Sequence, residues 1–406
     1  MTDSPRVLMF GWEFPPHNSG GLGTACFGIC QAMNRKNVDL IFVLPRRQLM
    51  PVGKLKFIFA GLENIKFKSV NSPIYPYITS QLYDQNLKLS GDQIYGANLF
   101  DEVLAYGRKA EVIARSQSYD IIHAHDWLAF PAGLMAKKIS GKPLIIHVHA
   151  TEFDRGGGNG VNQQVYNIEK EGMEKADGII AVSERTKNMI IKHYSIEPDK
   201  IKVVYNGNDN NEAIFTPVKL KSLKQVGKKI VLFLGRITLQ KGPDYFIATA
   251  NKVLARRSDV CFLVAGAGDM EYALIRQVAK LGLSDKILFV GFVRGNDLQA
   301  LYQAADLYVL PSVSEPFGLT PLEALSYGTP VLISFQSGVS EVLSHALKAD
   351  FWDTDEMSNK IISLLDNPAL GSTLSQYGQA EVKKITWDKS VLGYLDFYKK
   401  ILSAGY

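Results

Sequence analysis

The sequence predicts an α/β protein made of two Rossmann-like domains, each built on a doubly wound parallel sheet. Short apolar runs of strand length alternate with segments of helical periodicity from one end of the chain to the other. Such alternation is typical of parallel sheets with helices on both faces. The chain has 406 residues, which at roughly 150 residues per domain predicts two or three domains. The strand-like runs are too many for one sheet, so we expect two.

The predicted elements follow one another in a regular order. In the first half, strands are expected at Arg6–Phe10, Val38–Leu44, Asp120–His125, Pro143–His149, Gly178–Val182 and Ile201–Tyr205. Helical stretches such as Thr24–Arg35 and Trp127–Lys138 separate them. In the second half, strands are expected at Lys229–Leu234, Val260–Ala265, Ile287–Phe292, Leu307–Leu310 and Pro330–Ile333. The last segment, Thr386–Ile401, has the apolar spacing of one amphipathic helix.

The domain boundary is predicted between Asn206 and Lys229. That segment contains NGNDNN, Pro217 and the basic stretch KLKSLKQVGKK, and it has no strand signal. We interpret this segment as a linker whose lysines are solvated and do not form an anion site. We therefore expect an N-terminal domain over residues 1–215 and a C-terminal domain over residues 216–385. A tyrosine-rich stretch, Met50–Leu104, is extra to the first domain.

Composition excludes several classes of protein. Hydrophobic residues make up 46% and charged residues 21% of the chain, which is too apolar for a disordered chain. The longest apolar runs are strand-sized, so no membrane-spanning helix is expected. A net charge of +5 is too mild to predict nucleic-acid binding. The N-terminus is a poor signal peptide and the three cysteines cannot form a disulfide framework, so a cytoplasmic location is expected.

The first loop with possible chemistry is Ser19–Gly23, between a predicted strand and a predicted helix. Its glycines allow backbone N–H groups to approach an anion at a helix N-terminus, although a tight turn would also explain them. The third glycine of a dinucleotide fingerprint is replaced by Cys26. A reductase that holds a 2′-phosphorylated cofactor with Arg46 and Arg47 stays open as a distant alternative.

Two loops in the second half carry charges after predicted strands. Arg236 and Lys241 precede a helix that Pro243 is expected to open, and two cations beside a helix N-terminus suit a diphosphate. Further on, Thr320, Pro321 and Glu323 have the spacing of a capping box. Glu323 can therefore be explained by helix capping alone. Glu315 lies before that helix, where a carboxylate suits hydrogen bonding to the hydroxyl groups of a sugar or ribose.

The histidines and cysteines are candidate metal ligands. Alternation along a strand places His123 and His125 on the same face of one predicted strand. It likewise places His147 and His149 on the same face of the next. Their spacing matches no standard metal site, so we expect hydrogen-bonding roles for His125 and His149 and no metal. Cys26 and Cys30 are expected in the core. The pair Asp353 and Asp355 is expected to cap the following helix.

Taken together, these loops resemble the retaining GT-B glycosyltransferases of family four, the group that includes glycogen and starch synthases. The resemblance runs through SGGLG, HAHDW, HVHATEFDR, VSERTKNMI, VVYNGND, GRITLQKG, GAGD and SEPFGLTPLEALSYGTPV, in that order. Glu315 and Glu323 match the pair of glutamates that marks this group. The resemblance implies a GT-B fold with a deep interdomain cleft. It also implies that the final helix, residues 386–406, packs back onto the first domain.

The resemblance also implies roles for individual residues. The implied catalytic set is Glu315, His149, His125, Arg236 and Lys241. The implied donor-binding set is Gly20, Gly21, Asn206, Arg236, Lys241, Phe317, Gly318, Leu319, Thr320 and Glu323. In these roles the cations neutralise the donor diphosphate, Glu315 holds the sugar, and Glu323 holds the ribose. The nucleotide-diphosphate sugar is a co-substrate, and no other cofactor and no metal are implied.

The function expected from the resemblance is transfer of a hexose, most simply glucose, to an α-glucan-type acceptor. An alternative keeps the chemistry and changes the acceptor to a cell-envelope lipid or oligosaccharide. A non-catalytic sugar-binding protein is a third hypothesis. Starch-type synthases carry Lys where this chain has Asn18, and a Thr-Gly-Gly-Leu segment where it has residues 336–340. The nucleotide, whether UDP or ADP, is therefore left open. The sequence does not determine the oligomeric state either.

Overall fold

The computed structural model describes residues 4–15, 20–45, 56–59, 99–157, 160–209 and 227–404. They form two compact units: Met1–Gly207 together with Thr386–Tyr406, and Asn208–Ile385. The domain boundary expected after residue 215, like the tyrosines of the extra stretch and the pair Arg46 and Arg47, lies outside the described residues.

The first unit is built on a seven-stranded sheet in the order β3-β2-β1-β4-β5-β6-β7, and every neighbouring pair is parallel. Its strands are β1 (Val7–Phe10), β2 (Leu40–Leu44), β3 (Lys56–Phe59), β4 (Ile121–His125), β5 (Leu144–Val148), β6 (Gly178–Ala181) and β7 (Ile201–Val203). Six of these strands were predicted. The edge strand β3 was missed because it falls in the stretch interpreted as an insertion.

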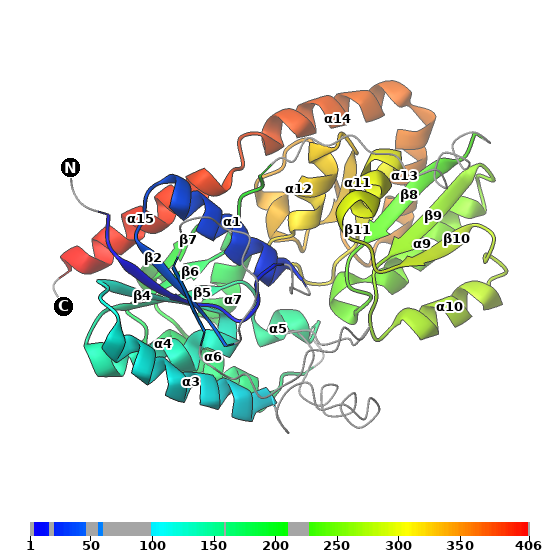
Figure 1. Ribbon diagram of the computed structural model, residues 1–406. Coiled ribbons are helices and arrows are strands. Elements are labelled where there is room, and N and C mark those ends of the chain that lie inside the picture. The colour runs from blue at the N-terminus through cyan, green and yellow to red at the C-terminus, as the bar shows by residue number, and fades with distance from the viewer. Residues whose placement is uncertain are drawn as a thin grey trace. The chain divides into compact units, whose positions relative to one another are not determined.

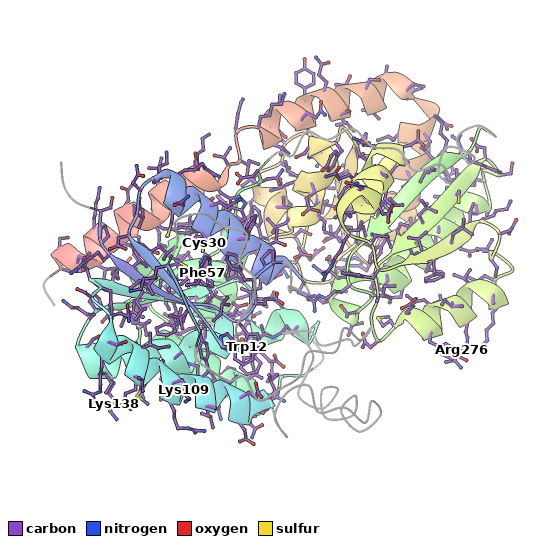
Figure 2. The ribbon with its side chains drawn as sticks, viewed as in Figure 1. Trp12, Cys30, Phe57, Lys109, Lys138 and Arg276 are labelled. Atoms are coloured by element: carbon purple, nitrogen blue, oxygen red, sulfur yellow. The ribbon has the colours of Figure 1, made fainter. Side chains whose placement is uncertain are left out.

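Helices cover both faces of this sheet, as Figure 1 shows. The helices are α1 (Gly21–Arg35), α3 (Leu99–Ser116), α4 (Asp126–Ser140), α5 (Glu152–Arg155), α6 (Gln163–Lys175), α7 (Glu184–Tyr194) and α15 (Trp387–Ser403). Helix α4 packs against α3 and α6 on one face, and the exposed Lys109 and Lys138, labelled in Figure 2, belong to α3 and α4. Helices α1 and α15 lie side by side.

The contact between α1 and α15 depends on one glycine and one ion pair. A Cβ atom at Gly28 would lie 2.2 Å from Nε1 of Trp387, so only glycine allows the two helices to approach so closely. Near the helix ends, Arg35 pairs with Asp388 at 2.7 Å. Cys26 and Cys30 lie on α1 and are fully buried, as predicted (Figure 2 labels Cys30).

The second unit has a six-stranded sheet in the order β10-β9-β8-β11-β12-β13, again parallel throughout. Its strands are β8 (Lys229–Leu234), β9 (Val260–Ala265), β10 (Ile287–Gly291), β11 (Leu307–Leu310), β12 (Val331–Ser334) and β13 (Leu347–Ala349). Only the three-residue edge strand β13 was not predicted. After β10 the chain crosses back past β9 and β8 to β11, so the strand order reverses between β8 and β11, where parallel sheets bind ligands.

The second sheet is also covered on both faces. Its helices are α9 (Pro243–Leu254), α10 (Glu271–Lys280), α11 (Gly295–Ala304), α12 (Leu319–Ser326), α13 (Thr354–Asp366) and α14 (Pro368–Val382). Residues of α9, α10 and α13 share one core with the sheet. Asp353 caps α13 by accepting a hydrogen bond from the Glu356 N–H at 2.8 Å, as expected. None of the described helices combines the length and the apolar character needed to cross a bilayer.

Candidate functional site

In the second unit, the loops after β8, β9 and β11 interlock at the carboxyl edge of the sheet. A Cβ atom at Gly266 would lie 1.9 Å from the Gly235 carbonyl oxygen, and one at Gly268 would lie 2.2 Å from that of Ile237. The run Gly266-Ala267-Gly268 is therefore explained by close backbone packing. The Arg236 guanidinium, on the first of these loops, lies 3.1 Å from Oε1 of Gln240.

Lys241 is brought next to Glu315 by the glycine that follows it. Gly242 has a φ of +62°, and a Cβ atom there would lie 2.0 Å from the Pro311 carbonyl oxygen, so the short helix η2 (Leu239–Lys241) sits directly against the end of β11. Lys241 and Glu315 form an ion pair in which their side chains are 16% and 7% exposed. Ser312 adds a hydroxyl 3.3 Å from Oε2 of Glu315. Pro243 opens α9, as predicted.

The backbone around Glu315 is held by a second strand-like segment. The Glu315 N–H donates to the Gln336 carbonyl at 2.9 Å, and the Gly338 N–H donates to the Glu315 carbonyl at 2.8 Å. The Val339 N–H donates to the Phe317 carbonyl at 2.7 Å. The Phe317 ring is buried in the core, so only its backbone is available to a ligand.

The helix after this loop begins earlier than the sequence predicted. Helix α12 starts at Leu319 and its N-cap is Gly318, which has a φ of +101° and no side-chain cap. The capping box of Thr320, Pro321 and Glu323 is therefore wrong, because Pro321 is the third helical residue and not the first. Within the described part of the chain, the backbone N–H groups of Gly318, Leu319 and Thr320 donate no hydrogen bond. Unpaired N–H groups at a helix N-terminus suit an anion, and these lie beside Glu315, the partner of Lys241.

The Glu323 side chain bonds to Tyr302 and does not cap the helix. Its Oε2 accepts a hydrogen bond from the Tyr302 hydroxyl at 2.8 Å. Burial raises the pKa of Glu323, and the hydrogen bond from Tyr302 opposes that rise. Thr320 Oγ1 lies 2.7 Å from the Tyr308 hydroxyl, which is also 3.0 Å from the Leu234 carbonyl. The α12 N-terminus is thus tied to the end of β8.

In the first unit, the predicted glycine loop leads into α1 with Gly20 as its N-cap. A Cβ atom at Gly21 would meet no described atom within 4 Å, so packing among those residues does not require glycine there. The Gly23 N–H donates to the buried carboxylate of Glu13 at 3.1 Å. The sequence analysis missed Glu13, although an acid placed shortly before a helix start is a recognisable signal.

His125 and His149 are brought together, as their positions on neighbouring strands implied. Nδ1 of His125 lies 2.9 Å from Nε2 of His149. His125 is 0% exposed and His149 is 8% exposed, so His149 is the one of the two that reaches the surface among the described residues. Burial lowers the pKa of His149 to about 3, which keeps its imidazole neutral.

Asp126 fixes the loop that carries His149. Its Oδ1 accepts hydrogen bonds from the backbone N–H of His149 at 2.7 Å and of Ala150 at 3.4 Å. Burial raises the pKa of Asp126 to about 7, and the charge of Arg155 opposes the rise. Asp126 has a φ of +57°, a strained conformation that such contacts can hold. The sequence analysis assigned Asp126 no role.

A buried ion-pair network anchors the same loop further along. Arg155 pairs with Glu152 at 2.9 Å and with Glu169, which also accepts a hydrogen bond from Tyr194. Burial alone would lower the pKa of Arg155, but the carboxylates of Glu169 and Glu152 raise it overall. These partners lie on α5, α6 and α7, so their meeting could not be inferred from local spacing.

Asn206 lies at the end of the first unit, where the chain leaves β7. It is buried, and its Oδ1 has no hydrogen-bond partner among the residues described. A Cβ atom at the next residue, Gly207, would lie 2.0 Å from the Trp387 backbone nitrogen. The Asn-Gly pair therefore combines a packing glycine with a side-chain oxygen, Oδ1 of Asn206, that no described residue bonds.

Two parallel-sheet Rossmann-like units, with charged and N–H-rich loops at the strand ends, define the GT-B class of glycosyltransferases. Residues 19–212 match the model of Glycosyltransferase Family 4, and residues 216–381 match that of Glycosyl transferases group 1. These two matches span nearly the whole chain. The chain belongs to the family-four glycosyltransferases, which are transferases of the GT-B type.

Several relatives agree with this assignment. An uncharacterised glycosyltransferase of Methanocaldococcus jannaschii is 28% identical over 97% of this chain and 98% of its own length. A D-inositol 3-phosphate glycosyltransferase of Salinispora arenicola is 29% identical over 73% of this chain and 72% of its own. A glycogen synthase of Mycobacterium tuberculosis is 26% identical over 90% of this chain and 87% of its own length.

The fold also matches a solved structure. The sucrose-phosphate synthase of Thermosynechococcus elongatus superposes with a TM-score of 0.76 at 18% identity, over 98% of this chain and 100% of that one. At that identity the match supports the fold alone.

Proposed function

We propose that this protein is a retaining glycosyltransferase that moves a hexose, most simply glucose, from a nucleotide-diphosphate sugar to an α-glucan-type acceptor. One observation carries the proposal: the Lys241–Glu315 pair lies beside the N–H groups of Gly318, Leu319 and Thr320. A cation and a helix N-terminus suit a diphosphate, and a carboxylate in the same place suits sugar hydroxyls.

The chemistry follows from where charge develops. As the bond between the anomeric carbon and the diphosphate oxygen breaks, positive charge grows on the sugar and negative charge on the leaving group. Arg236, Lys241 and the α12 N–H groups stabilise that negative charge, so the proposed reaction requires no metal ion. The acceptor hydroxyl oxygen bonds to the anomeric carbon on the face from which the diphosphate departs, and its proton passes to the diphosphate.

The two glutamates take different parts of the donor. In the proposed complex, Glu315 accepts hydrogen bonds from the sugar hydroxyls and Lys241 turns toward the diphosphate. Glu323 accepts hydrogen bonds from the ribose through Oε1, because Tyr302 already occupies Oε2.

We further propose that His149, Gly20, Gly21 and Asn206 contact the donor from the first unit. The low pKa of His149, about 3 because of burial, makes it a neutral hydrogen-bonding group. His125 then acts as a positioning residue through its hydrogen bond to His149.

A second acceptor class is supported by one relative. The D-inositol 3-phosphate glycosyltransferase of Salinispora arenicola resembles the chain as much as the glycogen synthase does, at 29% against 26% identity. A small phosphorylated polyol, or a cell-envelope lipid or oligosaccharide, is therefore the alternative acceptor. Because the chain belongs to the family-four glycosyltransferases, the hypothesis of a reductase with a 2′-phosphorylated cofactor is set aside.

The test is release of nucleotide diphosphate from a panel of donors that includes UDP- and ADP-glucose, with and without glycogen and with no added metal. Release that rises with glycogen supports the glucan acceptor and identifies the nucleotide. Slow release that glycogen leaves unchanged, but inositol phosphate or an envelope lipid accelerates, favours the alternative. No release from any donor would contradict the transferase activity and return the non-catalytic sugar-binding hypothesis.

A further inference from the structure

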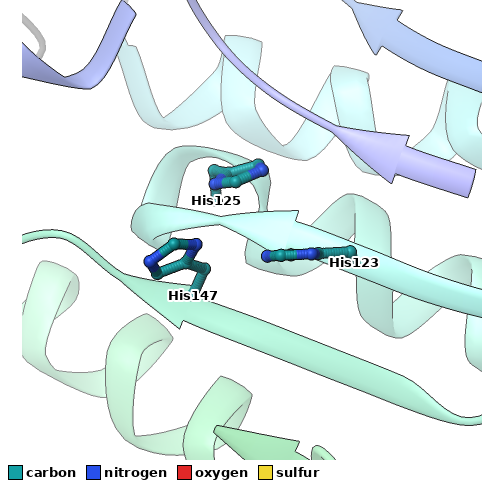
Figure 3. A group of neighbouring side chains, drawn as sticks. All are labelled: His123, His125 and His147. Atoms are coloured by element: carbon teal, nitrogen blue, oxygen red, sulfur yellow. The ribbon is translucent and has the colours of Figure 1, made fainter. Parts of the chain in front are cut away.

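Four histidines gather on one face of the first sheet. His123 and His125 lie on β4, His147 lies on β5 directly opposite His125 in the strand register, and His149 follows β5. The rings of His123 and His125 stack with centroids 4.4 Å apart, and those of His147 and His149 stack at 4.0 Å. Figure 3 shows His123, His125 and His147 gathered beside the two strands.

Three of these histidines have ring nitrogens without a partner. Among the described residues, no hydrogen bond reaches Nε2 of His123, Nε2 of His125 or either nitrogen of His147, and all these atoms are buried. Each of the three side chains belongs to a residue that is 0% exposed. Buried polar atoms without a partner are costly, so such a group calls for an unseen ligand.

The remaining nitrogens define a consistent set of tautomers. Nδ1 of His123 contacts the Tyr398 hydroxyl of α15, and Nδ1 of His125 contacts Nε2 of His149 at 2.9 Å. If each Nδ1 carries the proton and donates it, both Nε2 atoms are left with a lone pair that no described donor uses. A metal-bound histidine commonly donates its other N–H in this way.

We propose that His123, His125 and His147 bind one divalent transition-metal ion of the zinc class. One nitrogen from each residue lies within 4.8 Å of the others. Tetrahedral zinc with bonds of about 2.0–2.1 Å separates its nitrogen ligands by about 3.4 Å, so the rings of His123 and His125 turn from their stacked arrangement when all three nitrogens face one ion. Nitrogen ligands alone favour zinc, cobalt or nickel over magnesium or calcium.

The proposed site also borders the last helix. The Tyr394 ring of α15 lies 5.3 Å from that of His147, and its buried hydroxyl also has no described partner. Tyr394 thus packs beside His147.

The ion joins the sheet to α15 and has a structural role. Two of its proposed neighbours, Tyr394 and Tyr398, come from the last helix, whereas the ligands come from β4 and β5. No metal was expected from the sequence, because no single segment has the histidine spacing of a standard metal site. The third ligand is supplied by the strand register, which local spacing does not reveal. This inference does not rest on the proposed transferase function.

The experiment measures bound metal in the untagged full-length chain, unfolded and refolded with ZnCl₂ and dialysed against metal-free buffer. We expect about one zinc per chain by mass spectrometry, and an intense visible absorption band when Co²⁺ replaces zinc. His147→Phe keeps a ring in the core and should lose at least tenfold in zinc affinity. Tyr398→Phe removes only the hydroxyl beside His123 and should weaken binding about tenfold.

His345→Gln is the matched control, because His345 lies in the second unit and pairs with Glu381. It should bind zinc as the natural chain does. Circular dichroism identifies variants that do not fold, and His123→Leu serves as the second variant if His147→Phe fails. The proposal is overturned if the refolded natural chain retains no zinc and shows no cobalt band. It is overturned equally if a folded His147→Phe or His123→Leu chain binds as much metal as the natural chain.

Discussion

At the scale of single residues, Lys241 and Glu315 neutralise one another in a place where water reaches neither freely. Their side chains are 16% and 7% exposed, so the site is prepared for a ligand that offers both an anion and hydroxyl groups. In the proposed complex, the diphosphate competes with Glu315 for Lys241, while the sugar hydroxyls bind the carboxylate. Buried ion pairs are weak stabilisers, so exchanging this pair for contacts to the donor would cost the fold little.

Lys241→Met should lower kcat about 10²–10³-fold, because it removes a charge that stabilises the leaving diphosphate. The measurement is the initial rate of nucleotide diphosphate release with the best donor. Lys252→Met is the control, because Lys252 pairs with the largely exposed Asp355 and should keep full activity. A Lys241→Met protein that works within twofold of the natural rate would contradict the role.

Glu323→Gln should raise KM for the donor about tenfold and leave kcat nearly unchanged, because a ribose contact is the same in the ground state and the transition state. Tyr302→Phe removes the hydroxyl that occupies Oε2 and serves as a comparison with a smaller expected effect. Steady-state kinetics on both variants separates the two constants. If Glu323→Gln lowers kcat instead, the carboxylate takes part in the reaction and not in ribose binding.

At the scale of elements, α14 is fastened to the loop before β13 by its last acidic residue. Glu381 accepts hydrogen bonds from the His345 backbone N–H at 3.0 Å and from the His345 ring at 2.7 Å. Burial alone would raise the pKa of Glu381, but these hydrogen bonds lower it overall. A lowered pKa in the folded state means that the carboxylate stabilises the fold above its ordinary pKa, and that this stability is lost as the pH falls.

Glu381→Gln should therefore lower Tm at pH 7 by about 2 °C, and the difference should close as the pH falls below about 4. Thermal unfolding followed by circular dichroism at several pH values gives both numbers. Glu356→Gln disrupts an exposed pair with Lys360 at 2.8 Å and should change Tm little at pH 7. An equal difference at every pH would show that the Glu381 carboxylate charge is not responsible.

Most of the elements could be predicted because parallel strands buried on both faces leave continuous apolar runs. The two missed strands, β3 and β13, lie at sheet edges. Strand β3 falls in the stretch interpreted as an insertion, and β13 reads LKA, which is not a continuous apolar run. The start of α12 was misplaced because a backbone turn at Gly318, not a side-chain cap, begins the helix. At the candidate site, charged residues on strand-end loops were found by position. Glu13, Asp126 and Arg155 were missed because their partners come from other segments.

At the scale of the whole molecule, the first unit is discontinuous and the second is continuous. The first unit needs Thr386–Tyr406, whereas the second is the single stretch Asn208–Ile385. Helix α15 buries Trp387, Val391, Tyr394, Phe397 and Tyr398, and each large apolar side chain contributes about 1.5–3 kcal/mol when buried. Their sum is comparable with the whole stability of a typical domain, about 5–15 kcal/mol.

Residues 1–209 produced without α15 should therefore lack fixed tertiary packing, although all seven strands of their sheet are present. We expect dye binding to exposed apolar surface and loss of a cooperative thermal transition, both reversed when residues 386–404 are supplied as a separate chain. Residues 208–385 should unfold cooperatively alone, because their core is complete within the segment. Cooperative unfolding of residues 1–209 without α15 would contradict the argument, and would mean that the helix only covers a sheet already stabilised by α3, α4 and α6.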